Sequence, residues 1–179
     1  MTRFPSPHLS GPRLLLRPPV LDDADALFER IAGDPEVTRF LLWTVHPDAA
    51  ETRRVILHQL IEADRERTWV VTLRGSNDIV GLLSCRRFAR HSAEVGYCLA
   101  RRWWGMGLMS EALNLLLDQL AADPAIYRVW ATCHVDNGRS ALLLQRAGFV
   151  LEGRLARNAV YPNVAPEPDD SLLYAKILR

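Results

Sequence analysis

Three β-rich runs that follow one another closely constrain the fold of this chain more than any other feature. They are Thr68–Arg74, Ile79–Arg87 and Ala93–Leu99, and only Gly75-Ser76-Asn77-Asp78 separates the first two. Glycine and Asx residues in so short a gap form a hairpin turn, so the runs pair antiparallel. This meander excludes a doubly wound parallel sheet.

Patterns on either side of the meander complete a mixed order of strands and helices. Before it we expect an edge strand over Leu14–Pro19, a helix capped by Asp22 or Asp23 that ends near Ala32, and a helix from Pro47 to about Arg67. After it we expect a helix to about Ala122, a strand over Tyr127–Val135, a helix capped by Asn137 or Asp136 and ended by Gly148, a loop over Tyr161–Asp170 and a strand over Leu172–Leu178. The predicted class is α/β (α+β), a mixed, mostly antiparallel central sheet with helices on both faces.

Composition indicates one domain and removes several classes of function. The chain has 179 residues, 49% of them hydrophobic, and we find no linker or repeat, so we expect a single domain over residues 1–179. A net charge of +1 is too small for a surface that binds nucleic acid or an anionic membrane. No apolar run reaches the ~18 residues that span a bilayer, and prolines interrupt the first residues, so we expect a cytoplasmic protein. Three cysteines without a C-x-x-C pair predict neither a disulfide framework nor a metal site.

The segment between the meander and the next helix has the features of an anion site. Gly105 and Gly107 carry no Cβ, so a phosphate can approach the loop amides and the positive end of the following helix. Arg101 and Arg102 would add charge-assisted contacts. The alternative is that both glycines only ease a tight turn. A Walker sequence is absent and Ser110 breaks G-x-G-x-x-G, which excludes NTPases and dinucleotide-binding enzymes.

Asn137 and Ser140 begin the next helix, where both are good capping residues. A helix start beside the glycine loop would also present their polar groups to the same ligand. His134, Asp136 and Ser140 together suggest a serine hydrolase as a competing interpretation. We reject it because Gly-Arg-Ser-Ala-Leu lacks the last glycine of a nucleophile elbow.

Taken in order, these motifs resemble the GNAT superfamily of acetyl-CoA-dependent N-acetyltransferases, most closely its RimJ/RimL branch, which includes ribosomal-protein N-terminal acetyltransferases. The matching motifs are R-L-L-L-R-P at 13–18, A-E-V-G-Y at 93–97, R-x-x-G-x-G at 102–107, Asn137-x-x-Ser140, Gly148-Phe149, Glu152-Gly153-Arg154 and Leu172-Leu173-Tyr174. Individually they are weak, but their order is specific and covers nearly the whole chain. The resemblance implies a GNAT-like fold.

The resemblance also implies acetyl-CoA as the cosubstrate, with no metal. In the family the loop amides hold the pyrophosphate, the preceding strand splays to admit the pantetheine arm, and a strand N–H polarises the thioester carbonyl. Carried over, the cofactor-binding residues are Tyr97, Cys98, Leu99, Arg102, Trp103, Trp104, Gly105, Met106, Gly107, Leu108 and Asn137. Which of the two tryptophans faces the cleft stays open.

Attack on a thioester requires a neutral amine, a donor to the carbonyl oxygen and a proton for the departing thiolate. Many family members have a tyrosine acid where this chain has Leu144, and some have a glutamate base where it has Thr132. Both roles must therefore be filled by other residues. Ser140 is our candidate acid and Glu94 our candidate base, with His134 as a weaker substitute for the base. The plainer interpretations are a capping hydroxyl and a surface glutamate.

The predicted function is acetyl transfer to a primary amine by direct attack on the thioester. A protein N-terminal α-amine is favoured, because about a tenth of it is neutral at pH 7, against less than about one in a thousand for lysine. Two alternatives remain: an acetyltransferase for a small-molecule amine such as an antibiotic, polyamine or amino-acid analogue, and a coenzyme A-binding regulatory or degenerate module without catalysis. The acceptor and the oligomeric state, including a homodimer, stay open.

Overall fold

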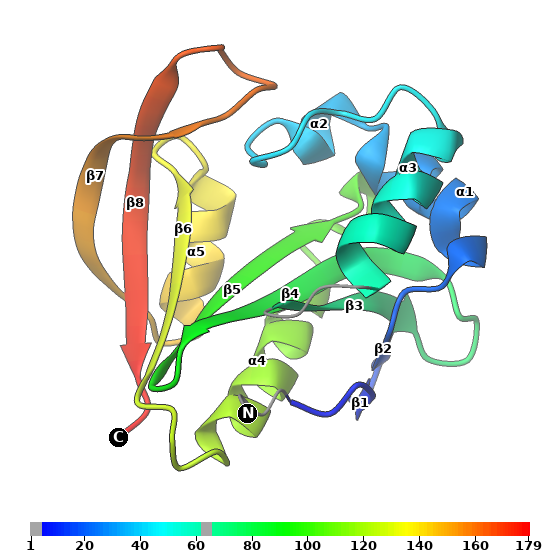
Figure 1. The fold of residues 1–179 in the computed structure, drawn as a ribbon. Helices are drawn as coiled ribbons and strands as arrows, with labels where there is room; N and C mark the ends of the chain where they lie inside the picture. Colours follow the sequence, from blue (N-terminus) through cyan, green and yellow to red (C-terminus); the bar gives the residue numbers. More distant parts are fainter. Residues whose placement is uncertain (1–4, 62–65) are drawn as a thin grey trace.

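One eight-stranded sheet forms the frame of the molecule, and this computed structural model describes residues 5–61 and 66–179 (Figure 1). The strands are β1 (Leu9–Ser10), β2 (Leu14–Arg17), β3 (Glu66–Leu73), β4 (Ile79–Ala89), β5 (Ser92–Leu99), β6 (Arg128–His134), β7 (Val150–Val160) and β8 (Pro168–Ile177). Their order in the sheet is β1-β2-β3-β4-β5-β6-β8-β7, and every pairing is antiparallel except β5 with β6. The predicted class of a mixed, mostly antiparallel sheet is confirmed.

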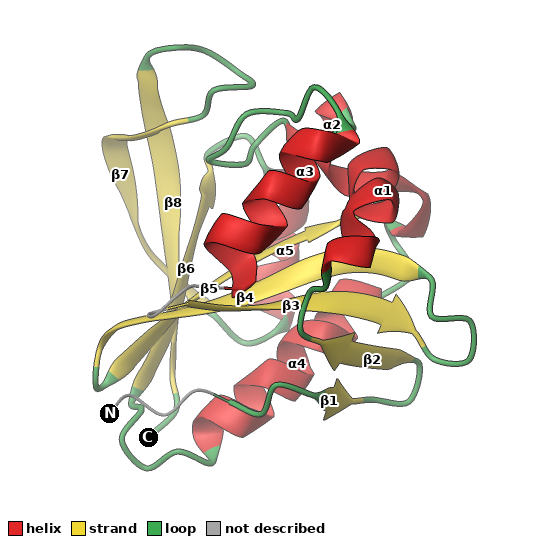
Figure 2. Cartoon of the chain, turned by 45° about the vertical axis from the view of Figure 1, so that its right-hand side comes forward, coloured by secondary structure: helices red, strands yellow, loops and turns green. Residues whose placement is uncertain are grey.

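Helices cover both faces of this sheet (Figure 2). They are α1 (Ala24–Leu27), α2 (Pro35–Thr38), α3 (Ala49–Val55), α4 (Leu108–Ala121) and α5 (Gly138–Arg146). Turns of π-helix over Phe28–Ala32 and Ile56–Ile61 continue α1 and α3. The first three helices lie over one face of β2 to β5, and α4 lies under the other.

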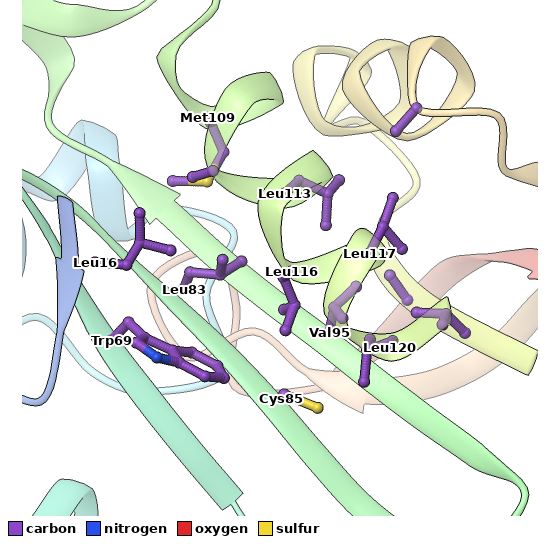
Figure 3. Packing of buried hydrophobic residues seen from close by; sticks show 14 of the residues in the cluster. Leu16, Trp69, Leu83, Cys85, Val95, Met109, Leu113, Leu116, Leu117 and Leu120 are labelled. Carbon is purple, nitrogen blue, oxygen red and sulfur yellow. The ribbon is translucent and has the colours of Figure 1, made fainter. Parts of the chain in front are cut away.

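Alternation along the strands divides the core between the two faces. In β3, Trp69 and Val71 belong to the buried cluster that contains α4, whereas Val70 belongs to the cluster under α1 and the turn after α3. This is the period of two expected of a strand that is covered on both sides. Figure 3 shows Leu113, Leu116 and Leu120 of α4 packed toward Trp69, Leu83 and Cys85 of the sheet. These three leucines recur at i, i+3 and i+7, the spacing of one helix face, and they form part of the buried face of α4.

The sheet opens where its one parallel pair ends. Strands β5 and β6 pair only through Ser92–Glu94 and Arg128–Trp130, and then diverge (Figure 1). Beyond Glu94, the described part of β5 has no ladder partner on its β6 side. Alternate backbone N–H and C=O groups of that stretch are therefore available to a ligand.

Near the amino terminus, one local prediction was wrong and one holds only in part. Strand β2 is not the edge strand, because the two-residue β1 pairs with it through Leu9 and Ser10. Asp23 occupies the N-cap position of α1, but its side chain makes no capping bond there, because a 3-10 turn after Val20 already begins the helical segment. Instead, Asp23 accepts the Val20 N–H at 2.9 Å and a fork of hydrogen bonds from Arg17 at 2.7 and 2.8 Å.

The helix predicted from Pro47 to Arg67 is shorter, and one strand was missed. Asp48 caps α3 by accepting the Glu51 N–H at 2.8 Å, whereas Glu66 and Arg67 already belong to β3. Positions 62–65 of the predicted helix lie outside the described residues. Strand β7 was not predicted because it lies at the edge of the sheet and is mostly exposed, so no apolar alternation marks it. The loop expected over Tyr161–Asp170 gives way to β8 at Pro168.

Within residues 5–61 and 66–179, no helix has the length and apolar character needed to cross a bilayer. The same residues contain no group of three or more His, Cys, Asp or Glu side chains arranged to hold a metal ion. The three cysteines are free thiols.

Candidate active site

Two cavities meet where β5 leaves β6. The loop cavity, of about 650 Å³, is lined by the glycine segment before α4 and by the start of α5. The sheet cavity, of about 450 Å³, lies between strands β3 to β5 and the segment from α1 to α3 that covers them. Phe40, Leu41, Tyr97 and Cys98 line both. A ligand in one cavity can therefore contact a ligand in the other at this junction.

The glycine segment provides the loop cavity with backbone donors. Gly105 and Gly107 have φ angles of +78° and +72°, a conformation that costs glycine little. Gly107 is the N-cap of the 14-residue helix α4, whose ladder begins with Glu111 N–H donating to the Gly107 carbonyl at 3.1 Å. The N–H groups of the three residues between them have no acceptor within the helix, and they stand at the positive end of its dipole. This end of the cavity suits an anion.

The structure distinguishes the two tryptophans. Trp104 lines the loop cavity, its indole N–H donates to the Leu99 carbonyl at 2.7 Å, and the guanidinium of Arg139 lies 4.3 Å from its ring centre. Trp103 packs instead against both buried clusters. Trp104 is therefore the tryptophan that faces the cleft.

Other residues expected at the cofactor lie elsewhere. Arg102 stacks over Trp103 at 4.6 Å, and Arg101 pairs with Asp34 at 3.3 Å. Met106 is 52% exposed. None of these four residues lines the loop cavity. The 3-10 turn over Arg101–Trp103 directs its side chains outward or into the core, and Met106, beyond that turn, is exposed. Among the described residues, the arginines that line this cavity are Arg39, Arg139 and Arg146.

Most of the remaining predicted residues line the loop cavity as a group. They are Tyr97, Cys98, Leu99, Trp104, Gly105, Gly107, Leu108, Asn137 and Ser140. The Asn137 amide oxygen accepts the Ser140 N–H at 3.2 Å, so Asn137 is the cap of α5. A capping role and a position at the cavity thus coexist in one residue.

A hydroxyl pair lies at the junction of the cavities. The Tyr97 hydroxyl is 2.8 Å from the Ser140 hydroxyl. Burial raises the pKa of Tyr97 well above its usual range, although the bond to Ser140 opposes the shift. Tyr97 therefore stays protonated at neutral pH. If Tyr97 donates to Ser140, the Ser140 proton is free for another acceptor.

Glu94 faces the sheet cavity within a row of charges across three strands. Its carboxylate lies 3.6 Å from Arg86 Nη1, and Arg86 Nε donates to Glu66 at 2.8 Å. The register pairs Glu66 with Arg86 and Arg86 with Glu94. Burial raises the pKa of Glu94, Arg86 opposes this, and Glu66 adds to it. The Glu94 side chain is only 15% exposed, so Glu94 is not a surface glutamate.

The other positions considered for catalysis differ in their surroundings. Leu144 is fully buried in the core, and Thr132 lines the sheet cavity but cannot act as a base. Nε2 of His134 lies 3.1 Å from the Asp169 carboxylate, and Nδ1 accepts the Asp136 N–H at 3.0 Å. His134 lines neither cavity, which leaves it a structural role.

Several residues of the site carried no signal in the sequence. Asn163, between β7 and β8, donates to the carbonyls of Thr38 and Trp43 and accepts the Val45 N–H at 2.9 Å. These bonds tie the end of β7 to the segment that covers the sheet cavity, where Tyr161 and Trp43 lie. Contacts over such sequence distances leave no local pattern, so only the folded chain reveals them.

Comparisons with known proteins agree with this geometry. A family model described as "Acetyltransferase (GNAT) domain" matches residues 13–150. The chain is 31% identical over 130 residues to the "Ribosomal-protein-serine acetyltransferase" of Escherichia coli (strain K12), covering 72% of this chain and 71% of that one. It is 30% identical over 147 residues to the "Uncharacterized N-acetyltransferase p20" of Bacillus licheniformis, covering 80% and 82%.

Solved structures give the same result. The RimL ribosomal L7/L12 alpha-N-protein acetyltransferase in complex with coenzyme A superposes with a TM-score of 0.79 at 25% identity, covering 95% of this chain and 97% of that one. An acetyltransferase (GNAT family) from Bacillus anthracis superposes with a TM-score of 0.84 at 24% identity, covering 96% and 98%. The second likeness concerns the fold alone.

Proposed function

Because the chain belongs to the GNAT acetyltransferase family and is an N-acetyltransferase, we propose that it takes acetyl from acetyl-CoA in the loop cavity and transfers it to an amine in the sheet cavity. We also propose that residues 1–179 form one such domain. The observation that carries the proposal is the junction at Tyr97 and Cys98, with candidate acid Ser140 on one side and candidate base Glu94 on the other.

The chemistry of the loop cavity fits coenzyme A. The amides of Gly107 and Leu108, at the end of the α4 dipole, would bind the pyrophosphate. Arg139 and Arg146 would add positive charge beside them. The unpaired backbone of β5 up to Leu99 would hold the pantetheine arm by strand-like hydrogen bonds. Acetyl-CoA supplies the activated acetyl thioester when bound.

Glu94 would take the proton that the substrate ammonium must lose before its nitrogen can attack. It stands four residue steps before Cys98 at the junction, which is about 13 Å of extended strand. The acceptor therefore enters between them, and its proton reaches the carboxylate through water. The nitrogen then bonds the carbonyl carbon, and backbone N–H groups of β5 stabilise the charge on the carbonyl oxygen. The C–S bond breaks as the nitrogen releases its second proton to water.

Ser140 would give its proton to the departing sulfur. Tyr97 keeps its own proton and can donate the existing 2.8 Å hydrogen bond to Ser140, which directs the Ser140 proton toward the sulfur. Ser140 regains a proton from water after the thiol leaves. The raised pKa of Tyr97 suits this role, because a phenol that stays protonated remains a hydrogen-bond donor.

Ser140→Ala is expected to lower kcat about tenfold, less than the ~10²–10⁴-fold typical of general acids, because a thiol with a pKa near 8.5 already leaves readily as a thiolate. Steady-state thiol release with saturating acetyl-CoA measures this. Tyr97→Phe is the matched variant and should reproduce part of the loss. Full activity in Ser140→Ala, with unchanged coenzyme A affinity, would contradict the assignment.

For the acceptor we propose a primary amine, and a protein N-terminus is preferred. Among the described residues, Glu51, Glu66 and Glu94 line the sheet cavity together with Arg86. Arg54 pairs with Glu51 at 2.6 Å, so Glu66 and Glu94 with Arg86 leave one net negative charge, which favours a cation. The similarity to an enzyme named for ribosomal-protein serine acetylation supports the same class.

The test is a panel of N-terminal peptides, polyamines, aminoglycosides and amino-acid analogues, followed by thiol release and mass spectrometry of the product. Turnover of peptides at the α-amine supports the proposal. Turnover of small amines alone would refute the proposed peptide acceptor but would still support an N-acetyltransferase. Coenzyme A binding without turnover of any class would favour a module that has lost catalysis.

A further inference from the structure

Arg13, in the turn between β1 and β2, reaches the back of the glycine segment. Its Nη1 donates to the Met106 carbonyl at 3.0 Å and its Nη2 to the Gly107 carbonyl at 3.3 Å. Arg13 itself does not line the loop cavity, although Gly107 and Leu108 do. The guanidinium thus holds the loop from outside the cavity lining.

Peptide geometry gives these two bonds a consequence for the amides. In a planar trans peptide, the carbonyl and the following N–H point in opposite directions, and the described residues contain no cis peptide. A Met106 carbonyl turned toward Arg13 directs the Gly107 N–H away from it. The Gly107 carbonyl does the same for the Leu108 N–H. Both donors then face the cavity side of the segment.

Glu111 holds the guanidinium in this position. Its carboxylate accepts Arg13 Nε at 2.7 Å and the Arg13 backbone N–H at 2.9 Å. A Cβ on Gly11 would lie 2.6 Å from Glu111 Oε1, so the β1–β2 turn closes tightly on this carboxylate. Glu111 also belongs to the first turn of α4, which makes the clamp one unit with the helix that follows the loop.

We propose that Arg13 is a positioning residue that orients the Gly107 and Leu108 amides toward the pyrophosphate of coenzyme A. This inference rests on the proposed cofactor site and extends it to a residue that touches no ligand. The guanidinium suits the task because it can serve two carbonyls and one carboxylate at once in fixed directions, which a lysine cannot.

The test compares Arg13→Gln with the wild type by calorimetry with coenzyme A and by kinetics with two acetyl donors. The expected result is an affinity for coenzyme A that falls about tenfold, because two charge-assisted bonds that align the donors are lost. KM for acetyl-CoA rises with it, while kcat at saturation changes little. With S-acetylpantetheine, which has no pyrophosphate, kcat/KM should not change. Arg13→Lys should recover only part of the affinity.

Two further variants keep the inference falsifiable. Glu111→Gln leaves Arg13 in the chain but removes its charged anchor, and it should show the same pattern with a smaller loss, even if Arg13→Gln fails to fold. Arg154→Gln breaks an exposed pair with Asp170 that lines neither cavity, and should leave coenzyme A affinity unchanged.

The outcomes separate this inference from the proposed function. Unchanged coenzyme A affinity in both clamp variants would overturn the positioning role. An equal loss with S-acetylpantetheine would also overturn it, since the effect would then be general. A wild-type protein that binds no coenzyme A would refute the cofactor site itself.

Discussion

Glu94→Gln is expected to lower kcat/KM for a peptide α-amine about 10²-fold at pH 7, at the lower end of the ~10²–10⁴-fold range for a general base. The lower end applies because about a tenth of an α-amine is already neutral there. The loss should shrink above pH ~8, where the free amine no longer needs the carboxylate. Kinetics from pH 6 to about 9.5 measure this. A loss that is the same at every pH would show that Glu94 does not act as a base.

Glu66→Gln is the matched control for this prediction. Glu66 lies in the same cavity and binds the same arginine, but from the opposite side, two strands away from the junction. Its substitution should cost much less activity than that of Glu94. Equal losses would assign the effect to the charge row as a whole rather than to one proton acceptor.

The pKa of Glu94 also predicts how stability depends on pH. Burial raises its folded pKa above the unfolded value of about 4.3, so the folded state retains the proton longer. The wild type therefore loses stability relative to Glu94→Gln as pH rises from about 4.3 through the folded pKa, and the two should converge below about 4. Urea unfolding at pH 4 and 7 measures the difference. Glu94→Gln should thus be no less stable at pH 7 while it is less active.

Gly105→Asp is expected to abolish useful coenzyme A binding, whereas Gly105→Asn should retain most of it. Both side chains tolerate a positive φ better than other residues, and a Cβ at Gly105 meets nothing within 4 Å. The two variants therefore fold alike and differ in one charge. A carboxylate about 4–5 Å from a phosphate costs about 3–4 kcal/mol at an effective dielectric of about 20, which corresponds to at least about 10²-fold in affinity.

Calorimetry at low and high salt measures this pair of variants. The difference between Asp and Asn should narrow as salt screens the repulsion. An equal loss in both would mean that the glycine is needed for the turn alone, the plainer interpretation of the segment. If both variants bind coenzyme A as tightly as the wild type, the pyrophosphate does not lie at this end of the cavity.

Much of the fold followed from short patterns. The meander from Thr68 to Leu99 was predictable because its turn residues and β-rich runs are local, and the buried face of α4 followed from its period. Predictions failed where tertiary contacts outweigh local preference. Asp23 stands at the N-cap of α1, but its carboxylate binds Arg17 instead of the helix amides, and β7 forms a strand at the sheet edge although its side chains are mostly exposed.

The site shows the same division. The glycine segment, its position before a helix, and the polar residues Asn137 and Ser140 were evident in the sequence, because amide exposure and capping depend on a few adjacent residues. The directions in which adjacent side chains point were not evident in the sequence. Trp103 and Trp104 are adjacent in sequence, yet one enters the core and the other lines the cavity.

By itself, the sequence determined the class of fold, the place of the loop proposed to bind the pyrophosphate, and the two residues proposed for proton transfer. Only the tertiary structure decided which groups act together: Tyr97 with Ser140, Glu94 with Arg86, and Arg13 with the loop it supports. The physical reason is range. Turns, caps and periodicity arise between residues a few positions apart, whereas the direction of a side chain across an opened sheet depends on packing between segments that lie far apart in the chain.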